Sequence, residues 1–484
     1  MNKLLNAMIA DNNYTTTENG GLAYRSTLNA VYDMFAFGGA MRKRSDADII
    51  NLFKKAYEEN PLYAVRCLFY LRDVRGGQGE RNFFRVCMRW LANEYPNTAL
   101  NIVHLIAEYG RWDDLYTFVG TPIEDTVFFW MKKQFLLDLN SKTPSLLGKW
   151  LKSENTSSKE SRKLGKKTRL AFGLTSKKYR KYLSELRTRI NIVEKLMSEN
   201  RWDEIEFDKI PSKAGLKYKN AFARREVERY RAFAQSKTTT VNAGTLYPYE
   251  VVENGLRYMR RDIDDTDRLM ANKYWDNLTD YFNGASFNAL CVVDTSASMR
   301  GTPLNVAISL GMYCAERGKG PFANHYIAFS RRPRLVAIEG VDFVDKISRI
   351  YRANLCENTN IEATFNMILD TLIKNKYSKE DLPQNLIIIS DMEFDFQRDD
   401  YSTEIGTLMD KMAQKWLEHG YILPHLIYWN VDARQENIPM KDNGKVTYVS
   451  GCSPTTFDAL MSGKTGIQLM YDILNSDRYK DIVI

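Results

Sequence analysis

Residues 287–294, FNALCVVD, form a short apolar run of strand-forming residues that ends in an acid. Residues 383–391, PQNLIIISD, repeat this pattern later in the chain. Helical patterns such as PLNVAISLGMYCAERG (303–318) and IEATFNMILDTLIKNK (361–376) lie between such runs. Alternating strands and helices are typical of a parallel, doubly wound sheet, in which each central strand is buried on both faces. We therefore predict a sheet domain of this class over residues 285–484.

The rhythm is different before residue 285. In PLYAVRCLFYLRDV (61–74) and NTALNIVHLIAEYGRWDDLYTF (97–118), apolar residues recur every three or four positions, which predicts helices. Short polar or glycine-bearing turns separate these segments, so we expect helical hairpins stacked in a loose, HEAT-like array. No fixed repeat period is found, which argues against a regular solenoid. The predicted fold class is α + α/β, with a helical domain over residues 1–284 and a Rossmann-like sheet domain after it.

The composition is that of a folded, soluble chain. Its 484 residues are enough for two or three domains, and 44% of them are hydrophobic and 26% charged. No segment approaches the run of about eighteen apolar residues that a membrane helix needs. The N-terminal residues turn polar too early for a signal peptide, and the six cysteines show no metal-binding spacing. We expect a cytoplasmic protein with no membrane partner.

Positive charge is concentrated in one segment. Between Lys142 and Arg189 there are 15 Lys and Arg against 3 Glu and no Asp, a local balance of +12. The whole chain carries a net charge of only +8, so the remainder is negative. Such a segment is either a solvated helix surface or a site for a polyanion.

Hard oxygen donors gather at the predicted strand ends. Asp294, Ser296 and Ser298 form a D-x-S-x-S pattern on the loop that leaves the first strand. Thr359 precedes a predicted helix, and Asp391 closes a later strand. In doubly wound folds, ligands bind at the carboxyl ends of the strands. Carboxylates and hydroxyls suit Mg²⁺ or Mn²⁺, although Asp and Ser before a helix also serve as helix caps.

Two other groups of residues could contact nucleic acid. The first group is four arginines around the glycine-rich turn of LRDVRGGQGERNFFR (71–85), Arg72, Arg75, Arg81 and Arg85. Their planar guanidinium groups suit phosphate, but pairing with Asp73, Glu80 and nearby carboxylates explains them equally well. The glycines are not a nucleotide-binding P-loop, because no Lys-Ser or Lys-Thr follows at the required spacing.

The second group lies in the basic segment, where aromatic residues alternate with cations. The candidate contacts are Lys166, Lys167, Arg169, Lys177, Lys178, Tyr179, Arg180 and Lys181. Stacking faces beside phosphate-neutralising charges are typical of sites for single-stranded nucleic acid. A helix that buries its aromatic residues and exposes its lysines would give the same pattern.

Residues 285–484 resemble a von Willebrand factor A domain. Asp294, Ser296, Ser298, Thr359 and Asp391 match the metal-ion-dependent adhesion site (MIDAS) of that family position by position. The resemblance implies a bound Mg²⁺ or Mn²⁺ and an open coordination position for an acidic residue of a protein partner.

The segments AYRSTLNAVYDMF (23–35), LRDVRGGQGERNFFR (71–85) and IAEYGRWDDL (106–115) resemble motifs of the TROVE module of Ro autoantigens. Residues 177–214 look closer to an uncharacterised TROVE-related group that also ends in an A-type domain. The resemblance implies a ring of helical repeats that binds small non-coding RNA or the single-stranded ends of RNA, as part of a ribonucleoprotein.

The sequence does not favour catalysis. None of its four histidines, at positions 104, 325, 419 and 425, lies in a motif for a nucleophile's base or a metal cluster. We therefore predict an RNA-binding protein that is not an enzyme. The alternative is a metal-dependent protein-interaction or assembly factor, for which the basic segment is only surface.

Overall fold

The two apolar runs that end in acids form the centre of a six-stranded sheet. The strands are β3 (Ala289–Asp294), β4 (His325–Phe329), β5 (Arg334–Ala337), β6 (Asn385–Ser390), β7 (His425–Asn430) and β8 (Val446–Ser450). Their order is β5-β4-β3-β6-β7-β8, and all neighbours are parallel except β4 and β5. This is the strand order of a doubly wound sheet. The chain adds strands outward from β3 on one side and outward from β6 on the other, so the switch point of the order lies between these two strands. The predicted fold class is confirmed.

Helices cover both faces of this sheet. They are α17 (Thr302–Arg317), α18 (Phe343–Ala353), α19 (Ile361–Asn375), α20 (Leu408–Glu418), α21 (Thr455–Leu460) and α22 (Gly466–Leu474). Helix α17 packs closely against β3, because a Cβ placed on Gly311 would lie 2.5 Å from a methyl carbon of Val293. Strands β3 and β6 are buried along almost their whole length, as central parallel strands should be.

The computed structural model describes residues 12–257, 265–329, 332–353, 360–394, 407–441 and 444–484. Before the sheet, the chain is mainly helical after a short hairpin of β1 (Tyr14–Thr16) and β2 (Leu22–Tyr24). One arm of helices rises from the sheet domain: α2 (Ala30–Phe37), α3 (Asp46–Glu59), α4 (Pro61–Arg72), α5 (Arg81–Glu94), α6 (Pro96–Ile102) and α7 (Ile106–Tyr109).

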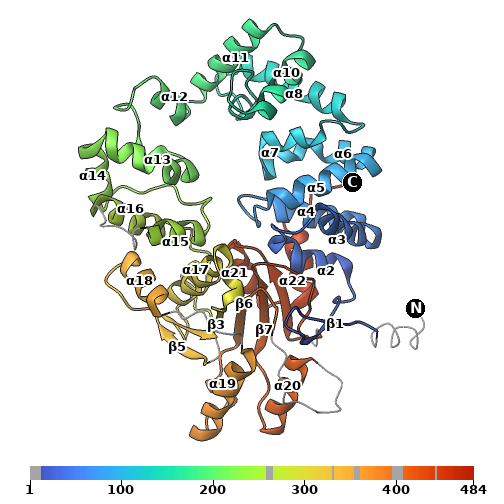
Figure 1. Cartoon of the computed structure of the whole chain (residues 1–484), viewed down its shortest axis with the longest axis vertical. Coiled ribbons are helices and arrows are strands. Elements are labelled where there is room, and N and C mark those ends of the chain that lie inside the picture. The colour runs from blue at the N-terminus through green and yellow to red at the C-terminus, as the bar shows by residue number, and fades with distance from the viewer. Residues whose placement is uncertain (1–11, 258–264, 330–331, 354–359, 395–406, 442–443) are drawn as a thin grey trace.

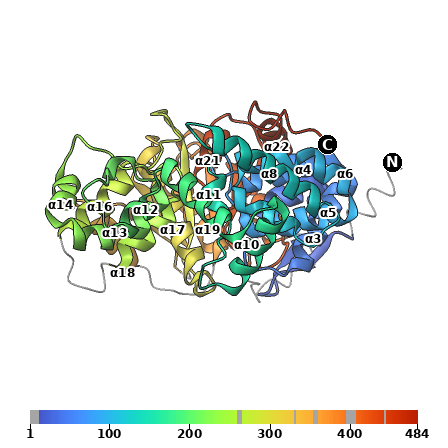
Figure 2. The ribbon, with the colours of Figure 1, turned by 90° about the horizontal axis from the view of Figure 1, so that it is seen from above.

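The array then crosses over and returns. The crossing is made by α8 (Glu124–Asn140), α9 (Leu147–Trp150), α10 (Lys159–Phe172) and α11 (Ser176–Arg189). The second arm consists of α12 (Val193–Ser198), α13 (Ser212–Arg225), α14 (Val227–Gln235), α15 (Pro248–Leu256) and α16 (Asp265–Asp276). Figure 1 shows the two arms on opposite sides of a ring, with α10 and α11 at the top and the sheet domain at the base. In the view from above, α3 to α6 and α13 to α16 lie at opposite ends of the molecule (Figure 2).

Both ends of the helical array rest on the sheet domain. At the start, α2 packs on β8, where the Tyr448 amide donates to Tyr32 Oη at 2.8 Å and Ser450 Oγ donates to the Phe35 carbonyl at 2.9 Å. At the other end, α15 packs on α17. The division in sequence near residue 285 therefore does not correspond to a separation in space.

None of the described helices is both long enough and apolar enough to cross a membrane. The described cysteines, at positions 67, 87, 291, 314 and 452, are buried free thiols.

Candidate functional site

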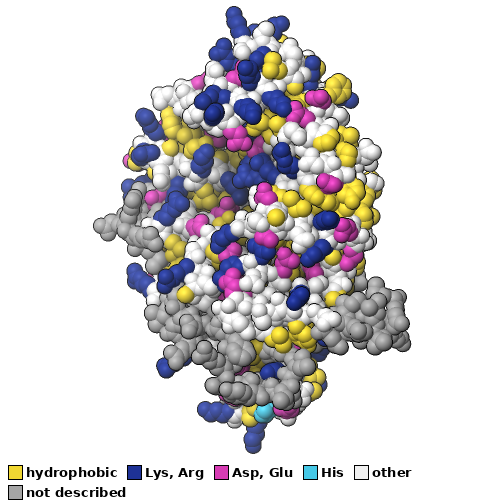
Figure 3. All heavy atoms as spheres, turned by 45° about the vertical axis from the view of Figure 1, so that its right-hand side comes forward, with side chains coloured by type: hydrophobic (Ala, Val, Ile, Leu, Met, Phe, Trp, Pro, Cys, Tyr) yellow, Lys and Arg dark blue, Asp and Glu magenta, His cyan; other side chains and the backbone are white. Residues whose placement is uncertain are grey.

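A cavity of about 590 Å³ lies inside the ring; we call it the interior cavity. Its lining comes from both arms and from the crossing: the turn after α4, residues 110–112, α9, residues 190–194 and α13. Seven cations line it, Arg72, Arg75, Arg81, Arg111, Lys149, Lys213 and Lys217. Glu194 is the only acidic residue among the described lining residues. Figure 3 shows Lys and Arg side chains gathered in the hollow at mid-height of the molecule.

The glycine-rich turn after α4 brings two of the predicted arginines to this cavity. Gly79 has a φ of +67°, which favours glycine, and a Cβ there would lie 1.8 Å from Tyr247 Oη. The turn is held from below by the sheet domain, because the buried Asp73 carboxylate accepts hydrogen bonds from Arg478 Nε at 2.8 Å and Tyr479 Oη at 3.0 Å. The sheet domain therefore fixes the loop that presents Arg75 and Arg81.

Two of the four predicted arginines are neutralised inside the protein. Arg72 is only 2% exposed, and its Nη2 lies 2.7 Å from Oδ2 of the fully buried Asp114. Arg85 lies outside the cavity lining, and its Nε is 2.7 Å from the other oxygen of Asp114. This corrects the assignment of Arg72 and Arg85 as contacts to RNA: their charges stabilise the helix packing.

The other two arginines remain available. Arg75 and Arg81 are exposed and form no ion pair with any described residue. Partial burial and the positive charges of Arg111 and Arg85 lower the pKa of Arg81. Neighbouring cations repel Arg81, which has no carboxylate partner of its own among the described residues, and this is the arrangement expected where an anion binds.

Lys149 and Lys217 are also available to an anion, because neither forms an ion pair with a described residue. Aromatic rings accompany these cations. Trp112 stacks on Trp130 with ring centroids 5.4 Å apart, and the guanidinium carbon of Arg111 lies 4.1 Å from the ring centroid of Trp150. Trp112 and Trp150 are half-buried and line the cavity. Trp112 is thus both a packing anchor and part of the cavity wall.

The predicted contacts of the basic segment, at positions 166–181, lie elsewhere, on α10 and α11 at the top of the ring (Figure 1). Lys167 pairs with Glu124 at 2.5 Å, and Arg169 pairs with Glu154 at 2.8 Å. The remaining cations of the prediction are exposed: Lys166, Lys177, Lys178, Arg180 and Lys181. None of them lines the interior cavity.

Tyr179 cannot act as predicted. Its side chain is fully buried, its hydroxyl donates to the Lys152 carbonyl at 2.9 Å, and its ring packs edge-on against Phe172. A base could not stack on it without unpacking the helix. The alternative interpretation of the alternating pattern, a helix with buried aromatic residues and exposed lysines, is the one the structure shows at this position.

A second group of predicted residues meets at the carboxyl ends of β3 and β6. Asp294 is fully buried; it accepts from the Ser296 amide at 2.9 Å and from Ser390 Oγ at 2.6 Å. Ser296 Oγ and Ser298 Oγ lie 2.9 Å apart. Burial and the negative charge of Asp391 raise the pKa of Asp294 to about 7. Thr359, the remaining predicted ligand, lies outside the described residues.

An arginine also reaches this edge. Arg434 Nη2 lies 3.0 Å from Oδ2 of Asp391, and Arg434 also pairs with Glu18 from the N-terminal hairpin. Nothing in the sequence around Arg434 identifies it as a neighbour of Asp391, because it follows a different strand.

The donor set fits a hard divalent cation. Two buried carboxylates that repel each other, with two hydroxyls beside them, are oxygen ligands of the type that Mg²⁺ and Mn²⁺ prefer. Among the described residues, no three His, Cys, Asp or Glu side chains are grouped to hold a metal ion, so a cation at this place would need the hydroxyls as ligands.

Comparison with known proteins identifies a family to which the chain belongs. Residues 17–171 and 145–285, together more than half of the chain, match a domain of unknown function, DUF2828. The chain belongs to the DUF2828 family. Residues 288–477 of this DUF2828 protein match a second domain of unknown function, DUF7788.

Relatives of this DUF2828 protein cover nearly its whole length. It is 28% identical over 498 residues to the uncharacterised protein L728 of Acanthamoeba polyphaga mimivirus, with 93% of this chain and 85% of the relative covered. The crystal structure of the Deinococcus radiodurans Ro protein (RSR) is similar over 90% of this chain and 100% of that one. The TM-score is 0.50 at 12% sequence identity, so the likeness supports a Ro-like fold.

Proposed function

We propose that this DUF2828 protein binds RNA and that the interior cavity takes a single-stranded segment. Single-stranded nucleic acid is bound by cations that neutralise phosphates and by aromatic faces on which bases stack. The interior cavity offers both, because Arg81 and Lys149 lack ion-pair partners among the described residues and Trp112 and Trp150 stand beside them. The Ro-like fold supports the same proposal.

The observation that most strongly supports RNA binding in this cavity is the excess of positive charge inside the ring. Seven cations and one carboxylate line a cavity of about 590 Å³, and four of the cations have no ion pair with a described residue. Partial burial, together with repulsion from Arg111 and Arg85, lowers the pKa of Arg81, and an anionic ligand would offset both effects. A surface helix with solvated lysines would not require side chains from both arms to converge in this way.

The test is to bind a labelled single-stranded RNA to the wild type and to an Arg81→Ala/Lys149→Ala variant. Each lost phosphate contact should reduce the slope of log affinity against log salt by about 0.7, so the double variant should lose about 1.4. The exposed pair Lys177→Ala/Lys178→Ala removes the same charge outside the cavity and serves as the control. Equal losses in both variants, or none in either, would refute binding in the interior cavity.

We propose further that residues 285–484 act as a von Willebrand factor A-type domain with a metal-ion-dependent adhesion site. Asp294, Ser296, Ser298 and Asp391 would hold the Mg²⁺ or Mn²⁺, and Thr359 is the fifth candidate. When bound, the metal supplies a Lewis-acidic position for an acidic residue of a protein partner. The buried, mutually repelling pair of Asp294 and Asp391 supports this proposal.

The two activities should separate with a chelator. The loop that carries Arg75 and Arg81 is fixed by hydrogen bonds from Arg478 and Tyr479 to Asp73, which need no metal, so EDTA should leave RNA binding intact. We propose a binding function and not a catalytic one, because the interior cavity offers cations and aromatic rings, which suit a single-stranded polyanion. The rival function is a metal-dependent assembly factor, for which partner capture would need metal and RNA binding would be absent.

A further inference from the structure

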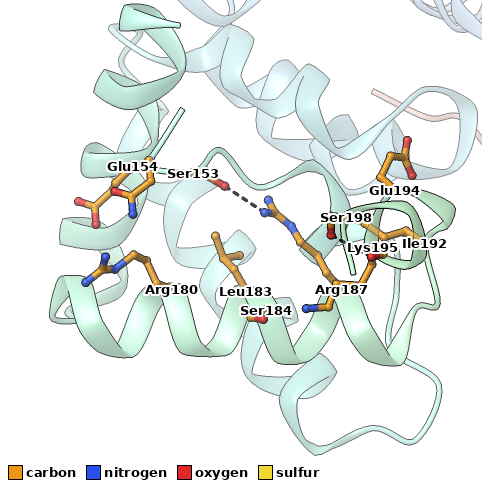
Figure 4. Close-up of a pocket in the computed structure, with 11 residues that line it drawn as sticks. Ser153, Glu154, Arg180, Leu183, Ser184, Arg187, Ile192, Glu194, Lys195 and Ser198 are labelled. Carbon is orange, nitrogen blue, oxygen red and sulfur yellow. Dashed lines mark hydrogen bonds between the residues drawn. The ribbon is translucent and has the colours of Figure 1, made fainter. Parts of the chain in front are cut away.

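A second cavity, with a volume of about 370 Å³, lies in the wall of the ring; we call it the wall cavity. It is enclosed by α11, α12 and residues 153–155 (Figure 4). Ile192 and Glu194 line both this cavity and the interior cavity, so the two adjoin at the segment that joins α11 to α12. Its volume lies within the range of about 300–1,000 Å³ typical of small-ligand sites.

Two guanidinium groups in the wall cavity have no carboxylate partner among the described residues. Arg187 donates to the carbonyls of Gly148 at 3.1 Å and Leu151 at 2.9 Å, and to Ser153 Oγ at 3.0 Å, the bond drawn in Figure 4. Burial lowers the pKa of Arg187, as expected for a charge that neutral groups alone surround. Arg180 is exposed and donates only to the carbonyl of Ser176, one turn away.

The same cavity holds two carboxylates with an unused oxygen each. Glu154 accepts from Arg169 through one oxygen at 2.8 Å, and Glu194 accepts from Tyr218 Oη through one oxygen at 3.2 Å. The second oxygen of each is buried and has no hydrogen-bond donor among the described residues. Buried acceptors of this kind are costly, and they mark a place where a ligand with N–H donors would be stabilised.

We propose that the wall cavity is a nucleotide subsite for a base with an exocyclic amino group, namely cytosine, adenine or guanine rather than uracil. Arg187 and Arg180, two turns apart on α11, contact successive phosphates of the strand, and Glu194 accepts hydrogen bonds from the amino group of the base. The inference rests on the proposed function, because the strand enters from the interior cavity past Ile192 and Glu194.

The chemistry of the bases gives the discrimination. Carboxylates accept hydrogen bonds from the N4 amino group of cytosine when proteins recognise that base. A uracil-type base presents the O4 carbonyl oxygen at the equivalent position, and this acceptor faces a carboxylate without a hydrogen between them. Because the second oxygen of Glu194 is buried, this side chain has to turn toward the cavity to reach the base.

The test compares oligocytidylate with oligouridylate of equal length, about 12 nucleotides, by fluorescence anisotropy. The wild type should bind the cytosine oligomer about tenfold more tightly. In Glu194→Gln, the side chain can donate as well as accept, so the ratio should fall to about one. Glu206→Gln, an exposed carboxylate outside both cavities, should keep the tenfold ratio.

Arg180→Ala completes the test, because it should weaken both oligomers by a similar factor through its phosphate contact. A wild type without preference, or a Glu194→Gln variant that weakens both oligomers while keeping their ratio, would overturn the inference. If the wild type binds both oligomers equally, only the subsite fails. If it binds neither oligomer, the proposed function fails with it.

Discussion

The hydroxyl of Tyr247 donates a hydrogen bond to the carbonyl oxygen of Gln78 at 3.1 Å, although 169 positions separate the two residues. Tyr247 stands at the start of α15 in the second arm, and Gln78 belongs to the turn after α4 in the first arm. The bond therefore joins the two arms at the wall of the interior cavity, which Tyr247 and Arg81 both line. Both residues are buried, so the Gln78 carbonyl would have no other donor if the Tyr247 hydroxyl were removed.

Tyr247→Phe should lower the free energy of unfolding by about 1–2 kcal/mol, because it leaves a buried carbonyl without its donor. Tyr249→Phe removes a neighbouring hydroxyl for which no hydrogen bond is seen among the described residues, and it should change stability by less than about 0.5 kcal/mol. Urea denaturation of both variants measures the difference. Equal stabilities would mean that the arms do not depend on this bond.

Gly79→Ala should be more destabilising than Gly173→Ala, although both positions have positive φ, at +67° and +70°. The left-handed conformation costs alanine about 1–2 kcal/mol at either position. At Gly79 the added methyl would also meet Tyr247 Oη at 1.8 Å, whereas at Gly173 the nearest atom is 3.8 Å away. Overpacking should add about 1–3 kcal/mol at Gly79, again measured by urea denaturation. Equal losses would place the two arms further apart than described.

The four arginines around this turn should divide into two classes. Arg72→Ala leaves the buried Asp114 with only part of its compensation and should cost about 3–5 kcal/mol of unfolding free energy. Arg75→Ala removes an exposed side chain and should change stability by less than about 0.5 kcal/mol while weakening RNA binding. Denaturation and anisotropy on both variants decide this. A stable Arg72→Ala protein with impaired RNA binding would reverse the assignment.

The four arginines show which features of the site can be predicted from the sequence and which cannot. Strand ends marked by Asp294 and Asp391 are a local signal, because an apolar run and its terminal acid are contiguous, and the sheet follows from them. Whether Arg72 or Arg75 is neutralised depends on Asp114, which lies about forty residues away and reaches Arg72 only through helix packing. The periodicity of α11 likewise permits Tyr179 to face either way, and burial decides.

The interior cavity could not be predicted for the same reason. Lys149, Tyr247 and the pair Lys213 and Lys217 on α13 come from three separate segments. Only the spacing of Lys213 and Lys217, one helical turn apart, could have suggested a shared face. Long-range closure of the ring brings these side chains together, and this is a property of the tertiary structure.

Arg434→Ala should tighten Mn²⁺ binding by about tenfold, or about 1.4 kcal/mol, because the guanidinium competes for an oxygen of Asp391 and repels a cation. Asp294→Ala should abolish binding while leaving the fold intact. Isothermal titration calorimetry measures both. If Arg434→Ala weakened Mn²⁺ binding, the arginine would be positioning Asp391 for the metal instead of competing with it.

The last prediction separates the inside of the ring from its top. A single strand held in the interior cavity should depend on Arg81 and Lys149, whereas a folded RNA with a single-stranded end should also touch the exposed cations of α11. Changing Lys177, Lys178 and Lys181 to Ser should therefore weaken the folded RNA and flatten its log–log salt slope by up to about 2, at about 0.7 per lost contact. A short single-stranded oligomer should bind this variant as it binds the wild type, because none of the three residues lines the cavity. Filter binding of both RNAs across a salt series gives the slopes. If the α11 variant left both RNAs unaffected, the basic segment would be a solvated surface; if it weakened the short oligomer as well, the strand would run over α11 and not through the ring.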